Sequence, residues 1–160
     1  KSSMSRRPIT KEGYEVLIKE LKHLKLRERP KVIQDLAAAR AHGDLSENAE
    51  YDAAKERQAY IEGKISDLES RLSMAEIIDL ATLPRDKVAF GAKVRLYNID
   101  TEEEELYQLV GPDESNVEQQ KISVFSPLGN ALLGKRVDDT ATVHAPRGII
   151  EYEILDIIFD

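Results

Sequence analysis

The sequence predicts a protein of two parts, an antiparallel α-helical coiled-coil hairpin followed by a strand-rich α+β domain. Charge is divided unevenly between them: residues 1–83 contain 15 Lys and Arg against 15 Asp and Glu, whereas residues 84–160 contain 8 against 15. Glycine and proline are scarcer in the first part, and β-branched residues are more frequent in the second. We therefore place the domain boundary between residues 83 and 84.

The composition excludes several classes of function. The chain has no cysteine, so disulfides, thiolate metal sites and thiol nucleophiles are ruled out. No apolar run approaches the roughly 18 residues of a membrane span, so we expect a cytoplasmic protein without a membrane partner. The net charge of −7 argues against wrapping nucleic acid on a basic surface. Residues 1–3 precede Met4, and we expect them to be an added remnant.

The first arm of the hairpin begins near Thr10, which is a suitable N-cap. Apolar residues then recur in steps of three and four at Tyr14, Leu17, Leu21 and Leu24. Pro30 interrupts this arm, because proline lacks the N–H donor and clashes with the preceding helical turn. We expect a kink or a short new start there.

The second arm has the regular spacing of coiled-coil a and d positions. Its apolar residues are Ile61, Ile65, Leu68, Leu72 and Ala75. The two arms are of similar length and flank one strong break at residues 42–44. They therefore form an antiparallel hairpin, and a stalk that only dimerises is its simplest interpretation.

Acidic residues are concentrated at the tip of this hairpin, near residues 43–52. The second helix is expected to begin at Asp44, which would serve as its N-cap, with Glu47 completing a capping box. Capping does not account for Glu50 and Asp52, which add to the mutual repulsion. The tip therefore carries more negative charge than a turn requires.

Asp44 and Glu47 lie about one helical turn apart, so both carboxylates could face one cation. Ca²⁺ takes six to eight oxygen ligands, whereas Mg²⁺ accepts one or two carboxylates when waters and substrate phosphates complete its octahedron. The isolated protein should bind Mg²⁺ weakly, and a partner could supply the missing ligands. The spacing thus indicates half of an active site. No Ser-His-Asp pattern suggests an independent hydrolase.

Basic residues flank the acidic tip. Arg40 precedes it, and Lys55 and Arg57 follow it by about two helical turns. Arg40 and Lys55 are well placed to hold a phosphate backbone, since such contacts position a nucleic acid. The basic residues between positions 19 and 31 are instead expected to form a solvated helix face paired with glutamates.

Period-two patterns dominate the second part of the chain. Strands are expected at residues 92–98, 106–110, 121–125, 140–144 and 149–159. Residues 101–105 are expected to form an acidic turn, and residues 145–148 a hairpin turn. Ser126 and Pro127 should cap and begin a short helix that ends at Gly134. Strands with one short helix predict an α+β domain.

Two long motifs resemble one known family. Residues 39–51 read Ala-Arg-Ala-His-Gly-Asp-Leu-Ser-Glu-Asn-Ala-Glu-Tyr, and residues 126–135 read Ser-Pro-Leu-Gly-Asn-Ala-Leu-Leu-Gly-Lys. Both resemble signatures of the Gre family of bacterial transcript cleavage factors, and the first is closer to the GreA type than to GreB. The resemblance covers essentially residues 4–159. One departure is Asp138, where the family often has glycine; aspartate tolerates turn geometry.

The resemblance implies that the chain is an elongation factor rather than an enzyme. Domain 84–160, FKBP-like in the family, would dock on RNA polymerase, and the hairpin would enter its secondary channel. Polymerase would then cleave the nascent RNA 3′ end of backtracked complexes. The implied residues are Asp44 and Glu47 as ligands of a Mg²⁺ shared with the polymerase, Arg40 and Lys55 near RNA, and Asn48, Glu50 and Tyr51 as tip support. No tightly bound cofactor is implied, and we expect a monomer.

Four alternatives remain at this point. A Gre-fold paralogue could inhibit polymerase through the same channel, although Asp44 and Glu47 in the family's usual frame argue against this. A self-sufficient Mg²⁺ nuclease would cleave RNA without polymerase. In a purely structural stalk, neutralising the tip would alter only helix stability. Isomerase activity is not expected from the implied fold alone, because a fold does not confer activity.

Overall fold

The structure, a computed structural model, describes residues 6–43 and 48–159 and contains two compact units. One unit is Tyr14–Met74, and the other combines the chain before Tyr14 with the chain after Met74. The two-part fold class is confirmed. The compositional boundary at residues 83 and 84 stays a prediction. Within the described ranges, no helix has both the length and the apolar character needed to cross a membrane.

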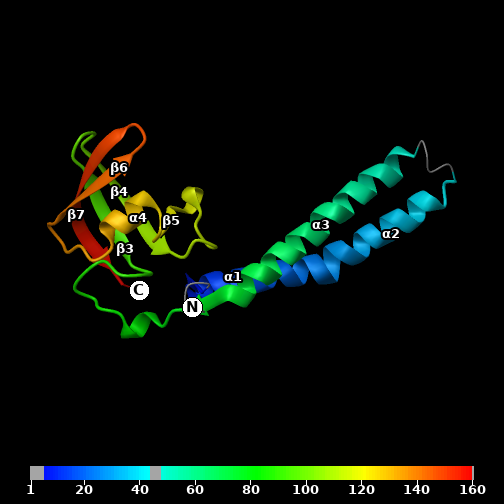
Figure 1. Cartoon of the computed structure of the whole chain (residues 1–160), viewed down its shortest axis with the longest axis horizontal. Helices are drawn as coiled ribbons and strands as arrows, with labels where there is room; N and C mark the ends of the chain where they lie inside the picture. Colours follow the sequence, from blue (N-terminus) through cyan, green and yellow to red (C-terminus); the bar gives the residue numbers. More distant parts are fainter. Residues whose placement is uncertain (1–5, 44–47, 160) are drawn as a thin grey trace. The chain divides into compact units, whose positions relative to one another are not determined.

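The first unit is a helical hairpin, in which α2 and α3 run side by side (Figure 1). Its elements are α1 (Lys11–His23), the π-helical turn η2 (Leu24–Glu28), α2 (Arg29–Arg40) and α3 (Ala49–Met74). The buried side chains form one narrow seam, as the heptad spacing predicts: Leu17, Leu24, Val32, Leu36, Ala39, Ala54, Ile61, Ile65 and Leu68.

Pro30 interrupts the first arm, as predicted, and the chain adapts by widening one turn. The N–H of Arg29 donates to the carbonyl oxygen of Leu24, which is five residues earlier rather than four. A proline would clash with a carbonyl four residues before it. The π-helical turn immediately before Pro30 is therefore explained by the proline itself.

Ion pairs cross the hairpin between the two arms. The pairs are Lys25–Glu69, Arg29–Glu62, Arg57–Asp35 and Lys64–Glu20. All are exposed, so each contributes little to stability. The hydrogen bonds from Arg29 lower the pKa of Glu62 below its ordinary value. The basic stretch thus contains glutamate-paired, solvated residues, as predicted.

The second unit is built on a five-stranded sheet of order β5-β4-β3-β7-β6 (Figure 1). Its strands are β3 (Lys93–Asn98), β4 (Glu103–Val110), β5 (Lys121–Ser123), β6 (Thr140–Ala145) and β7 (Gly148–Ile158). Pairing is antiparallel except between β4 and β5. Single 3₁₀ turns lie at Leu80–Thr82 (η4) and Val117–Gln119 (η5).

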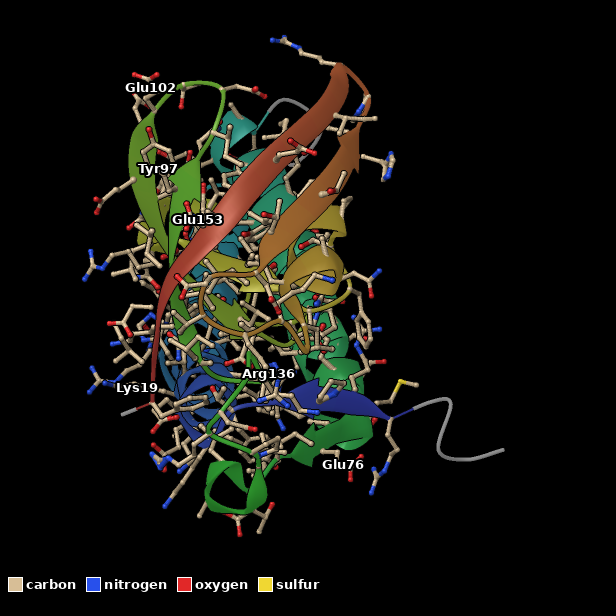
Figure 2. All side chains as sticks on the ribbon, turned by 90° about the vertical axis from the view of Figure 1, so that its left-hand side faces the viewer. Lys19, Glu76, Tyr97, Glu102, Arg136 and Glu153 are labelled. Carbon is tan, nitrogen blue, oxygen red and sulfur yellow. The ribbon has the colours of Figure 1, made fainter. Side chains whose placement is uncertain are left out.

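The core of this unit lies on one face of the sheet, beneath the short helix α4 (Pro127–Leu132). Val94 and Leu96 of β3 are fully buried there, and alternation along the strand places Tyr97 on the opposite face. Figure 2 shows Tyr97 beside Glu153, its register partner on β7. The period-two pattern therefore predicted correctly which side chains of β3 face the core.

Several boundaries in this unit differ from prediction by a few residues; β5, for example, ends at Ser123 rather than at residue 125. The acidic turn is shorter than residues 101–105, because β4 already begins at Glu103, and Glu102 occupies the turn at a φ of 63° (Figure 2). Ser126 caps α4 as predicted, with its hydroxyl accepting from the N–H of Gly129, but α4 ends at Leu132 rather than Gly134. Asp138 adopts a φ of 76°, so the local loop has the left-handed geometry that glycine favours.

A second small sheet joins distant parts of the chain. Strand β1 (Arg7–Ile9) pairs in parallel with β2 (Ala75–Ile77), so the placement of Ala75 in the helical seam was wrong. The Arg7 guanidinium binds both oxygens of Asp113, at 2.7 and 3.0 Å. These contacts link residues about one hundred positions apart, which no local pattern reveals.

The first turn of α1 is held by Glu114. Its carboxylate accepts from the backbone N–H of Thr10 at 2.7 Å, from the Thr10 hydroxyl at 2.5 Å and from the N–H of Gly111 at 2.9 Å. The Thr10 hydroxyl in turn accepts from the N–H of Gly13, which confirms Thr10 as the N-cap. A Cβ at Gly13 would lie 1.9 Å from the Glu114 carboxylate, so a larger residue here would displace that carboxylate from its present position.

Candidate functional site

The candidate site is the hairpin tip, between α2 and α3 (Figure 1). Helix α2 ends at Arg40, and Gly43 turns the chain with a φ of 100°. Asp44 and Glu47 lie outside the described residues. Helix α3 begins at Ala49, so the predicted helix start at Asp44 was wrong.

Asn48 caps α3 and also connects the two arms. Its side-chain oxygen accepts from the N–H of Tyr51 at 3.0 Å, which is an N-cap bond. Its amide nitrogen donates to the carbonyl oxygen of Ala39, near the end of α2, at 2.7 Å. One side chain thus satisfies an unpaired donor at the start of α3 and fixes the end of the opposite helix. The N-terminus of α3 does not need Asp44 as its cap.

Two further contacts cross the tip. The Arg40 guanidinium lies over the Tyr51 ring, 5.8 Å from its centre. Nδ1 of His42 lies 3.2 Å from a carboxylate oxygen of Glu50, and both side chains are largely exposed. Asn48, Glu50 and Tyr51 therefore each face the end of α2 or the turn that follows it.

The basic side chains near the tip differ in their partners. Arg57 forms an ion pair with Asp35, so a carboxylate already occupies this guanidinium. Within residues 6–43 and 48–159, no carboxylate pairs with Arg40 or Lys55. Arg40 and Lys55 thus differ from Arg57 in having no described carboxylate partner.

The described part of the tip does not form a metal site by itself. No group of three or more His, Asp or Glu side chains among the described residues could hold a metal ion. Glu50 is engaged with His42. The carboxylate oxygens of Asp44 and Glu47 are the ligand type that Mg²⁺ prefers, and two of them leave most of an octahedron to other donors.

The sheet unit has aromatic and acidic side chains that sequence reasoning did not bring together. The Tyr107 hydroxyl donates to a carboxylate oxygen of Glu105 at 2.7 Å. Burial, with this hydrogen bond, raises the pKa of Tyr107, and burial also raises that of Tyr152. Both phenols therefore stay protonated at neutral pH and act as packing groups with satisfied polar tips.

Comparison with known proteins gives the class. The family model "Transcription elongation factor, N-terminal" matches residues 7–77, and "Transcription elongation factor, GreA/GreB, C-term" matches residues 83–159. Both units are therefore those of a transcription elongation factor. The chain belongs to the GreA/GreB family.

Individual relatives agree over nearly the whole chain. The chain is 55% identical to transcription elongation factor GreA of Trichlorobacter lovleyi over 153 residues, covering 96% of this chain and 97% of the relative. Identity and coverage are the same for GreA of Pelobacter propionicus. Among solved structures, GreA factor homolog 1 of Thermus thermophilus is 32% identical, with 96% and 99% of the two chains covered and a TM-score of 0.45.

Proposed function

We propose that this elongation factor binds RNA polymerase, inserts its hairpin into the secondary channel and stimulates cleavage of the nascent RNA 3′ end in backtracked complexes. Membership of the GreA/GreB family supports the class of activity. A hairpin arm of 26 residues is about 39 Å long at 1.5 Å per residue, which suits a tip that acts far from its base. The polymerase supplies the catalytic centre, so the factor is not itself a nuclease.

The observation that carries the proposal is which tip residues have a structural partner and which do not. Asn48 provides the cap of α3, so Asp44 and Glu47 are not needed for that task. Arg40 and Lys55 have no carboxylate partner among the described residues, and they flank the acidic segment on both arms. An acidic segment flanked along the chain by cations that have no described carboxylate partner suits metal-dependent chemistry on a phosphodiester.

In this proposal Asp44 and Glu47 contribute carboxylates to a Mg²⁺ site that polymerase completes. The bound ion would stabilise the charge that develops on the oxygens of the scissile phosphodiester. Arg40 and Lys55 attract the RNA phosphates and hold the 3′ segment near the tip. Asn48 keeps the end of α2 and the start of α3 together, so that the tip is presented on a fixed support.

The test uses stalled, backtracked elongation complexes with Mg²⁺, with and without the protein. The parent should shorten the RNA, whereas D44N and E47Q should reduce the rate roughly a hundredfold or more through loss of transition-state stabilisation. E56Q, which changes an exposed acid on α3, serves as the matched control and should keep the parent rate. Both tip variants should still compete with the parent for polymerase.

Other outcomes distinguish the alternatives. Slower elongation without shortened RNA would identify an inhibitor of the channel. RNA cleavage by the protein without polymerase would identify a nuclease. Calorimetric titration of the isolated protein with Mg²⁺ should show only weak binding, and tight binding would contradict the shared site. Near-parent cleavage by D44N would remove the proposed role of the tip.

A further inference from the structure

We propose that Tyr51 is a positioning residue that holds the Arg40 guanidinium ready for a phosphate of the RNA 3′ segment. This inference rests on the proposed function and assigns a role to a side chain that touches neither metal nor scissile bond. The cation–π contact between the two side chains carries the argument, with Arg40 5.8 Å from the ring centre.

The contact orients the guanidinium without consuming its hydrogen-bonding capacity. A guanidinium over an aromatic ring is attracted to the π face without forming a hydrogen bond, so the contact itself uses none of its five N–H donors. A carboxylate partner would occupy those donors, as Asp35 does for Arg57. Arg40 has no such partner among the described residues, so no described carboxylate competes with a phosphate for its donors.

The backbone at both ends of this contact is fixed by one side chain. Asn48 donates to the carbonyl of Ala39, the residue before Arg40, and accepts from the N–H of Tyr51 itself. Ala39 is nearly fully buried, which anchors that turn of α2 against the seam. The Cα positions of Arg40 and Tyr51 are thus set relative to each other across the hairpin, and the cation–π contact places the guanidinium over the ring.

The ring, rather than the hydroxyl, carries the proposed role. The phenol oxygen of Tyr51 makes no hydrogen bond to any described residue. Phenylalanine would therefore keep the stacking surface, whereas leucine would keep apolar bulk but lose the π face. Tyr60 is a matched control, because it lies on the same helix, is 64% exposed and has no described cation over its ring.

The experiment measures factor-stimulated cleavage on backtracked complexes as a function of factor concentration. We expect Y51F to match the parent and Y51L to lower the saturating cleavage rate about two- to fivefold, the range of an exposed cation–π contact. The concentration for half-maximal effect should not change, because docking on polymerase lies elsewhere. Y60L should match the parent in both quantities.

A double-mutant cycle tests whether Tyr51 acts through Arg40. R40A should lower the saturating rate at least as much as Y51L, and the R40A/Y51L double variant should fall no further than R40A. R40K should also lower it, since an ammonium lacks the planar fork. Crosslinking of the factor to the RNA 3′ end should decrease in the same order.

Three results would overturn the inference: a parent-like rate for Y51L, an equal loss for Y51F and Y51L, or additive losses in the double variant. If Y51L has an altered melting profile, the inference is tested instead with Y51F, which keeps the aromatic ring, and with R40K, which keeps a positive charge at position 40. If the parent itself fails to shorten RNA, the proposed function falls as well. If the parent cleaves RNA and Y51L cleaves it at the same rate, only the proposed role of Tyr51 is refuted.

Discussion

Asn48 makes two hydrogen bonds that two substitutions can separate. In Asn48→Asp the carboxylate still accepts from the N–H of Tyr51, and aspartate and asparagine are nearly equal as N-caps. The same change removes the amide donor to the Ala39 carbonyl. In Asn48→Ala both bonds are lost. The difference between the variants therefore isolates the cap, and the difference between parent and Asn48→Asp isolates the bridge between the arms.

The magnitudes follow from the remaining partners. The Ala39 carbonyl also accepts from the N–H of His42 at 3.1 Å, so loss of the Asn48 amide does not leave it unpaired. We expect the bridge to contribute about 0.5–1 kcal/mol, the range of an ordinary hydrogen bond. Loss of the N-cap costs about 1 kcal/mol more. Asn48→Asp should thus lower the free energy of unfolding by about 0.5–1 kcal/mol, and Asn48→Ala by about 1.5–2 kcal/mol.

The assay is equilibrium urea denaturation of the full chain, followed by circular dichroism at a wavelength dominated by the helices. If Asn48→Asp is as stable as the parent, the contact with Ala39 contributes nothing and the two arms end independently. If Asn48→Asp and Asn48→Ala are equally unstable, capping by Asn48 contributes nothing. Either result would refute the account of the tip as a pair of helix ends joined by one side chain.

Three other substitutions or conditions test the supporting structure. Glu114→Ala removes the acceptor of three hydrogen bonds and should lower the free energy of unfolding by about 3 kcal/mol, whereas Glu118→Ala, at an exposed carboxylate, should have little effect in the same urea titration. Asp138→Gly should raise it by about 0.5 kcal/mol, because φ is 76° there, and a lower value would contradict the argument from backbone strain. Glu62 has a lowered pKa in the folded state, so its pairing with Arg29 stabilises the hairpin fully above the ordinary carboxyl pKa of 4.5. This stabilisation is lost as the pH falls from 4.5 through the lower pKa of the folded state. Across this pH range, the melting temperature of Glu62→Gln should therefore depend less on pH than that of the parent.

The helical hairpin is predictable because its seam is a local property. Ile61, Ile65 and Leu68 recur at steps of three and four, and each is buried as that spacing requires. The cap at Thr10 and the interruption at Pro30 also follow from the chemistry of single residues. Alternation along β3 likewise gave Val94 and Leu96 as core.

The start of α3 shows where local reasoning fails. Asp44 and Asn48 are both good N-caps, and the acidic pattern around Asp44 made it the better choice by sequence. Asn48 is the cap in the structure, where its amide also reaches the carbonyl of Ala39 on the other arm. That second bond depends on the separation of two helices, which the residues near position 48 do not encode.

The sequence by itself determined the family signature, the two-part organisation, and the acidic tip with its basic flank, because each depends on residue identity and spacing along a short segment. Only the tertiary structure decided which partners the basic residues meet: Arg57 meets Asp35 across the hairpin, while the Arg40 guanidinium lies over the Tyr51 ring. It likewise decided that Arg7 meets Asp113, 106 positions away. Such pairings are set by how distant segments pack, since the free energy of a contact between them is gained only after the chain between them has been ordered.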